Sequence, residues 1–177
     1  MRIETIPEHA LSADIDTAIG ALMDAGFGEE AGFRGQSFHK MRHHLRIVGW
    51  QDGQMIGHVA MQLRAIRANN AALTIAAIGE VAVHPAHQGK GIGSALMRRA
   101  IGTAKDTVAE FAMLFGHPGL YAPLGFCNQP NRLTYVTWAN HTPRDVVTDT
   151  IESLMVLPLG STHWDETAEI NLCGPLF

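Results

Sequence analysis

Apolar and polar residues first follow a helical period. Behind Ser12 or Asp14, either of which can cap a helix, apolar residues recur every three or four positions. Gly26 and Gly28 are typical of the end of such a helix. The pattern predicts a helix with one apolar face, made by Ile15, Ile19, Leu22 and Met23.

Strand patterns surround this helix. Asp52-Gly53 suits the positive φ angles of a tight turn, so it predicts a hairpin between segments 45–50 and 55–63. The apolar run over 73–83 predicts a strand covered on both faces. The fold class is therefore α+β, with helices packed on a mixed sheet. The remaining predicted elements are strands at 2–6, 111–115, 133–138 and 151–157 and short helices at 36–44 and 118–123.

A glycine-rich segment follows the strand that ends at Val83 and precedes a helix expected to run to about Ala104. The first N–H groups of a helix have no partner within the helix and carry the positive end of its dipole. The three alternating glycines between positions 89 and 93 let an anion approach the backbone, and Lys90 adds a positive charge. This arrangement predicts a site for a phosphate or pyrophosphate.

Two common phosphate-binding patterns do not fit this segment. The Walker pattern needs Ser or Thr after Gly-Lys, but Gly91 follows Lys90. The dinucleotide pattern needs a third glycine at position 94, where the chain has Ser94.

The remaining pattern, Gln-x-x-Gly-x-Gly from Gln88 to Gly93, resembles the pyrophosphate-binding segment of the GCN5-related N-acetyltransferases (GNAT). A second segment, from Tyr121 to Gly125-Phe126, resembles the later Tyr-x-x-x-Gly-Phe segment of that family. The resemblance implies a single acetyltransferase domain over residues 1–177. It also implies a mostly antiparallel sheet with helices on both faces, splayed at the strand that ends at Val83.

The resemblance implies acetyl-CoA, or coenzyme A, as the co-substrate. The end of the strand 80–83 would hold the pantetheine arm through its backbone, and a backbone N–H at Val83 would polarise the thioester carbonyl. His117 stands where the family often has an Asn that contacts the cofactor. The expected cofactor-binding residues are Val81, Ala82, Val83, Gln88, Gly89, Lys90, Gly91, Ile92, Gly93, Ser94 and His117.

Two residues are the catalytic candidates. By resemblance, the Tyr121 hydroxyl would lie beside the thioester sulfur and donate a proton to the leaving thiolate. Glu80 would accept the proton of the amine, directly or through a water. The alternative for Glu80 is a charge pair with a neighbouring Arg, or a position that faces solvent.

Three further histidines are not expected to be catalytic. His58 is expected to be a hydrogen-bonded core residue. His39 and His43 are four positions apart, which on a helix suits a metal ion. They stand among Lys40, Arg42 and Arg46, however, so a basic surface patch is the preferred interpretation and no metal is expected.

The resulting function is an N-acetyltransferase that moves an acetyl group from acetyl-CoA to a primary amine of a small molecule. Segments 57–60, 80–83, 156–159 and 167–169 are similar to the aminoglycoside 2′-N-acetyltransferases. The surroundings of His58, segment 157–160 and Gly174-Pro175 are similar to the nodulation N-acyltransferase. An amino sugar is therefore one candidate acceptor. The alternatives are a longer-chain N-acyltransferase and a non-catalytic CoA-binding sensor or interaction module.

The composition of the chain limits the classes of partner that it can bind. The 177 residues carry 13 Lys plus Arg and 17 Asp plus Glu, a net charge of −4, and 46% of them are hydrophobic. This balance argues against disorder and against a nucleic-acid partner. No apolar stretch reaches the length of a membrane helix, so no membrane partner is expected. Two cysteines suit a reducing, cytoplasmic location. A homodimer is a possible assembly that the sequence does not decide.

Overall fold

The computed structural model describes residues 1–139 and 141–177. The chain folds into two compact units, each assembled from two separate stretches: residues 1–62 with 78–100, and residues 63–77 with 101–177. Strands β3 (Gln54–Ala68) and β4 (Ala71–Val83) and helix α2 (Ile92–Lys105) each contribute to both units. The expectation of a single domain over 1–177 stays a prediction.

The first unit is an antiparallel sheet with two helices. Strand β1 (Arg2–Pro7) pairs with β2 (Leu45–Gln51), which pairs in turn with β3. The expected helix over the first apolar stripe is confirmed as α1 (Ala13–Phe27). Its N-cap is Ser12, whose hydroxyl accepts from the Ile15 N–H at 3.3 Å, so the cap satisfies one free donor of the first turn.

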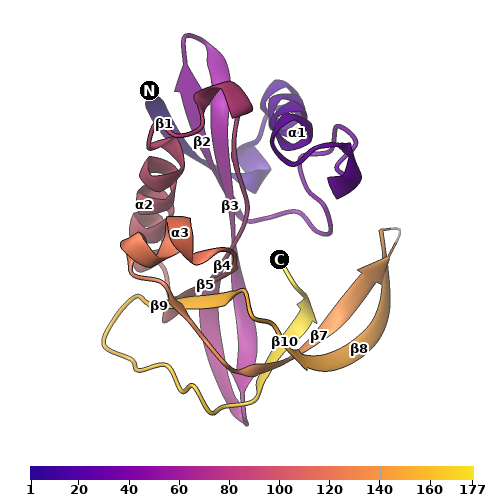
Figure 1. Ribbon diagram of the computed structural model, residues 1–177, viewed down its shortest axis with the longest axis vertical. Helices are drawn as coiled ribbons and strands as arrows, with labels where there is room; N and C mark the ends of the chain where they lie inside the picture. Colours follow the sequence, from indigo (N-terminus) through magenta and orange to yellow (C-terminus); the bar gives the residue numbers. More distant parts are fainter. Residues whose placement is uncertain (140) are drawn as a thin grey trace. The chain divides into compact units, whose positions relative to one another are not determined.

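The two helices cover opposite faces of this sheet (Figure 1). Val48 packs in one core cluster with α1, whereas its neighbour Gly49 faces Leu96 of α2. The close approach of α2 explains Gly57, because a Cβ atom there would lie 2.6 Å from Leu96 Cδ1. The expectation of helices on both faces is confirmed.

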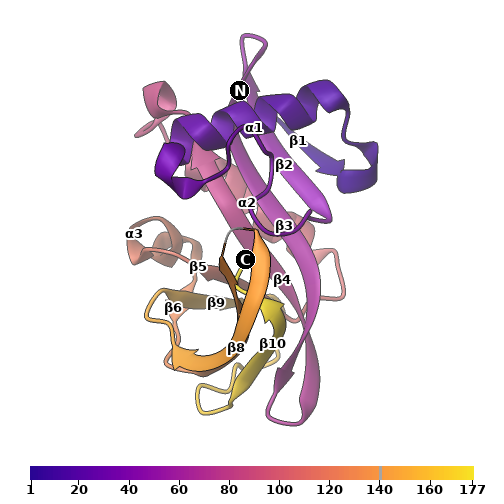
Figure 2. The same cartoon turned by 90° about the vertical axis from the view of Figure 1, so that its right-hand side faces the viewer.

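The second unit is a mixed sheet built around the first half of β4 (Figure 2). The β4–β5 and β10–β7 pairs are parallel, and the pairs of β9 with β5, of β9 with β6, of β10 with β3 and of β8 with β7 are antiparallel. The mixed, mostly antiparallel sheet is thus confirmed, while the splay of the strand ending at Val83 stays a prediction. The elements are β5 (Phe111–Phe115), α3 (Pro118–Tyr121), β6 (Cys127–Asn128), β7 (Arg132–Ala139), β8 (Thr142–Thr150), β9 (Leu154–Pro158) and β10 (Ile170–Pro175).

Trp164 anchors the core of the second unit. Its indole lies edge-on to Phe111 at 5.0 Å and is only 4% exposed. The indole N–H donates to Asn131 Oδ1 at 2.9 Å, so the one polar atom of this side chain is satisfied inside the core. The amide of Asn131 in turn donates to the carbonyls of Asp165 and Ala168, which ties the loop after β9 to the core.

The structure corrects the expectations about four elements. Segment 36–44 is not a helix but an irregular stretch, because its backbone groups bond the side chains of Arg46 and Glu80. Strands β6, β8 and β10 were not expected. Strand β8 is exposed along almost its whole length, so it lacks the alternation of apolar and polar residues that predicts a strand.

No helix within the described residues is long and apolar enough to span a membrane.

Candidate functional site

The glycine-rich loop between β4 and α2 is braced by its own side chains. Gln88 Nε2 donates to the Val83 carbonyl at 3.2 Å, and Lys90 Nζ donates to the Ala86 carbonyl at 3.0 Å. Both bonds link the loop to the strand end or to the short helix that follows it. The loop is therefore held in one shape before any ligand arrives.

The inner side of this loop is open backbone. Gly89 and Gly91 have φ angles of +73° and +75°, and a Cβ atom on either would meet no heavy atom within 4 Å. Glycine is favoured here because side chains rarely adopt this φ. Helix α2 begins at Ile92, and its first bond across the turn runs from the Ala95 N–H to the Gly91 carbonyl. The N–H groups of a first helical turn have no partner within the helix, so those ahead of this bond suit an anion.

Glu80 occupies a strained position in β4. Its φ angle is +50°, a left-handed value that non-glycine residues rarely adopt, and it lies inside a strand. His58 Nδ1 lies 2.9 Å from the Glu80 carbonyl oxygen. Since that oxygen can only accept, Nδ1 carries the proton and donates it. The neighbouring strand β3 thus supports the unusual backbone.

The Glu80 carboxylate is enclosed by donors. One oxygen accepts from the backbone N–H of His39 at 2.9 Å. The other lies 2.8 Å from His43 Nε2 and 3.4 Å from Arg46 Nη1. Burial alone would raise the pKa of this carboxyl, but the bonds from His43 and from the His39 backbone lower it below the ordinary value. Glu80 is therefore ionised at neutral pH.

Arg46 is the centre of this cluster and is completely buried. Its Nε and Nη2 donate to the two carboxylate oxygens of Glu8 at 2.7 and 3.1 Å, a two-pronged ion pair. Its Nη1 donates to the Ser37 carbonyl at 2.7 Å and reaches Glu80. Two carboxylates and a carbonyl thus compensate one buried cation.

His58 is a core histidine, as expected. It is fully buried, and burial lowers its pKa to about 3, helped by the positive charge of Arg46. The imidazole is therefore neutral at neutral pH.

The basic surface patch expected around His39 and His43 is wrong for two of its members. His43 is 9% exposed and Arg46 is fully buried, and both face the Glu80 carboxylate. Arg42 behaves as expected, since it is half exposed and pairs with Glu8 and Asp16 at the surface. The sequence could not predict the burial of Arg46, because the acidic residues that pair with it lie far away in the chain.

Tyr121 is fixed against the end of β5 in the second unit. Its ring packs directly over Gly116, where a Cβ atom would collide with it. The same ring lies edge-on to the buried Phe126 at 6.1 Å. Burial raises the pKa of the phenol above its ordinary value, so the hydroxyl keeps its proton at neutral pH. A protonated phenol on a rigid ring is suited to act as a proton donor.

His117 caps the short helix that carries Tyr121. Its Nδ1 accepts from the Gly119 N–H at 3.2 Å, which requires Nδ1 to be unprotonated, and Pro118 begins the helix behind it. The side chain is exposed. His117 therefore orients the segment that presents Tyr121, whatever else it contacts.

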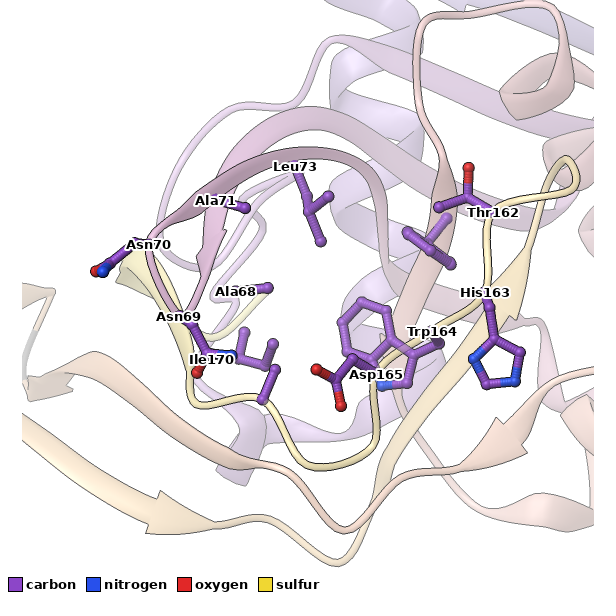
Figure 3. Close-up of a pocket in the computed structure, with 12 residues that line it drawn as sticks. Ala68, Asn69, Asn70, Ala71, Leu73, Thr162, His163, Trp164, Asp165 and Ile170 are labelled. Atoms are coloured by element: carbon purple, nitrogen blue, oxygen red, sulfur yellow. The ribbon is translucent and has the colours of Figure 1, made fainter.

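A separate cavity of about 430 Å³ lies at the opposite end of β5 from Tyr121, beside Phe111, the first residue of that strand. Figure 3 shows the side chains of Leu73, Ile170 and Trp164 gathered around it. The turn at Asn69-Asn70 and the loop 162–165 form its rim. Its walls are mainly apolar and it holds none of the residues expected from the sequence.

A family model described as an acetyltransferase (GNAT) domain matches residues 9–127, which include the glycine-rich loop, Glu80 and Tyr121. The chain belongs to this family. No protein with a curated description matches the chain.

Solved structures agree with the GNAT fold. A GNAT family acetyltransferase from Brucella melitensis in complex with acetyl-CoA is 21% identical, with 96% of this chain and 94% of that one covered and a TM-score of 0.60. The GNAT family N-acetyltransferase YhbS from Escherichia coli, in complex with CoA, is 20% identical over 97% and 90% of the two chains, with a TM-score of 0.66. The ribosomal-protein-S18-alanine N-acetyltransferase from Escherichia coli is 19% identical over 93% and 100%, with a TM-score of 0.56.

The expected site residues of this GNAT domain fall into two groups. Glu80, the strand end 81–83 and the loop 88–94 belong to the first unit, and His117 and Tyr121 belong to the second. The resemblance to the aminoglycoside and nodulation branch stays a prediction. Segment 37–43, which surrounds Glu80, is the part of the site that the sequence did not indicate.

Proposed function

We propose that this protein transfers an acetyl group from acetyl-CoA to a primary amine of a small molecule. The proposal is carried by the braced glycine-rich loop, whose open backbone and adjoining helix start suit a pyrophosphate. Membership of the GNAT family and the CoA-bound relatives support the same co-substrate. In this role the backbone of residues 89–94 binds the pyrophosphate, Lys90 adds charge, and Val81, Ala82 and Val83 hold the pantetheine arm.

The reaction is a direct transfer. The amine nitrogen forms a bond to the acetyl carbon while the bond from that carbon to sulfur breaks, and a backbone N–H at Val83 stabilises the oxyanion. The departing thiolate takes the Tyr121 proton. The amine gives up its proton to water. Glu80 is too strongly stabilised as an anion to be a strong base, so we assign it a supporting electrostatic role beside His43.

Replacement of the phenol tests this function. Tyr121→Phe removes the proton donor and keeps the ring on Gly116, so kcat for thiol release should fall about 100-fold or more, while acetyl-CoA affinity stays within a few-fold. The other tyrosine of the chain provides the matched control, Tyr135→Phe, which should not change kcat. Unchanged turnover in Tyr121→Phe would remove the tyrosine from the mechanism.

The same assay separates the alternatives. Acetyl-, butyryl- and palmitoyl-CoA are compared as donors across a panel of amines. Preference for palmitoyl-CoA would identify a longer-chain acyltransferase. Tight acetyl-CoA binding without turnover on any amine would identify a CoA-binding module, and no binding at all would contradict the proposed co-substrate.

A further inference from the structure

Arg64 is a buried cation without a counter-ion. It lies on β3 in the second unit, is 9% exposed, and forms no ion pair with any residue of the ranges 1–139 and 141–177. Taking a guanidinium out of water is costly unless an anion compensates it. Burial accordingly lowers its pKa from the ordinary value. The fold keeps this charge desolvated without supplying the partner.

The surroundings of Arg64 are built to hold the guanidinium in one position. Its Nη1 donates to the Pro175 carbonyl at 2.6 Å, and its Cζ lies 5.7 Å from the centre of the Phe177 ring. Gly174 leaves the space that the group fills, since a Cβ atom there would collide with Nη2. One hydrogen bond and one ring fix the plane of the fork.

The other side of the fork is available. No carboxylate of residues 1–139 and 141–177 lies within ion-pair distance of Nε or Nη2, and 9% of the residue is exposed. This edge of the guanidinium has two parallel N–H groups, the geometry that a carboxylate or a phosphate accepts with two oxygens.

A chain of contacts links Arg64 to Tyr121. The Phe177 ring that faces Arg64 also packs against Phe115 at 5.1 Å, and Phe115 is the last residue of β5. The next residue, Gly116, carries the Tyr121 ring. Arg64 and the proposed proton donor thus lie at the same end of β5 within one unit.

We propose that Arg64 binds an anionic group, a carboxylate or a phosphate, on the acceptor amine. The inference rests on the proposed function, since Tyr121 marks where the thioester reacts. It assigns the acceptor to amines that also bear a negative group, and not to polycations. Segment 173–177, which lies around Arg64, contains no acidic side chain that would attract a polycation.

Matched amine pairs test the substrate class. Each pair differs only in the anion: β-alanine against its carboxamide, 6-aminohexanoate against its carboxamide, and glucosamine 6-phosphate against glucosamine. We expect a kcat/KM preference of about 10- to 100-fold for the anionic member of at least one pair, the range of a charge-assisted hydrogen bond. The carboxylate and phosphate arms decide which anion is bound.

Three variants connect the preference to Arg64. Arg64→Met should reduce it to about one, and Arg64→Lys, which keeps the charge without the fork, should retain part of it. Arg67→Met is the matched control, because Arg67 is an exposed residue of the same strand and its loss changes the net charge equally. It should leave the preference intact. Unchanged acetyl-CoA binding by each variant shows that it is folded.

The outcomes separate this proposal from the proposed function. Equal turnover of both members of every pair, or an unchanged preference in Arg64→Met, overturns the Arg64 site and leaves the acetyltransferase standing. Calorimetric titration of the same amines supplies the second readout. Binding of the anionic members that Arg64→Met abolishes, without turnover of any amine, supports the site and contradicts the proposed function. Absence of both turnover and binding contradicts both.

Discussion

Two buried arginines on neighbouring strands have opposite surroundings. Arg46 has Glu8 on two of its nitrogens and Ser37 and Glu80 on the third, so its charge is compensated from all sides. Arg64 has one carbonyl and one aromatic ring. Both guanidinium groups are desolvated, so the two arginines differ only in the acceptors and anions that the protein places around them. Arg46 is fully paired and joins three segments of the first unit, whereas Arg64 keeps one edge for the ligand proposed above.

The largest effect on stability is expected when the paired arginine, Arg46, is replaced. Arg46→Met leaves two carboxylates in the interior without their cation, so the free energy of unfolding should fall by about 3–5 kcal/mol. Arg42→Met is the control, because Arg42 also bonds Glu8 but is half exposed, and should cost about 1 kcal/mol or less. Urea denaturation measures both. Equal losses in the two variants would show that burial of the pair carries no special weight.

Acid should weaken the same cluster. His58 has a folded-state pKa of about 3, below its ordinary value, so the unfolded chain binds more protons as the pH falls from about 6.5 to about 3. The lowered pKa values of Glu8 and Glu80 act in the same direction. From about pH 7 to about pH 4, His58 alone should cost about 3 kcal/mol.

Urea denaturation at a series of pH values checks this. His58→Gln should flatten the slope of stability against pH by about one proton in this window. His9→Gln, at an exposed histidine, is the control for the loss of one imidazole. A slope that is the same in His58→Gln and in the parent protein would refute a neutral, buried His58.

The smallest effect is expected at the other arginine. Arg64→Met removes a cation that has no counter-ion among the residues that the structure describes, so the lost hydrogen bond is offset by relief of the desolvation cost. The free energy of unfolding should change by about 1 kcal/mol or less, in either direction. Denaturation under the conditions used for Arg46→Met makes the comparison direct. A loss as large as that of Arg46→Met would make Arg64 a structural residue.

Local patterns predicted the elements whose burial repeats with a regular period. The helix after Ser12 and the strand Phe111–Phe115 appear where expected, because the apolar residues that they bury lie close together in the sequence. Segment 36–44 shows the limit. Its spacing resembles a helix, but the Ser37 carbonyl and the His39 N–H serve Arg46 and Glu80 instead. These tertiary bonds outweigh the local preference and cannot be read from spacing.

The same limit applies to the site. The glycine-rich loop was predictable because its chemistry is contained in one continuous segment, from Gln88 to Ser94. The Arg46 cluster was not, because Glu8, Arg46 and Glu80 come from three distant parts of the chain. Arg64 carried no signal either, since a single arginine in a strand has no spacing to interpret. The role of Arg64 depends on which partners the fold places around its guanidinium, and only the structure shows them.

The hairpin of β3 and β4 has a consequence for how the chain reaches its fold. The first unit combines residues on both sides of the turn of this hairpin, whereas the second combines the turn end, residues 63–77, with residues 101–177, so both strands enter both units. They are joined by a turn at Asn69-Asn70, so their first pairs close at a small loss of chain entropy, while most other strand pairs join distant residues. An early hairpin offers each unit a sheet edge on which to assemble. Neither unit is a continuous piece of chain, and a single proteolytic cut cannot release one of them as an independent fragment.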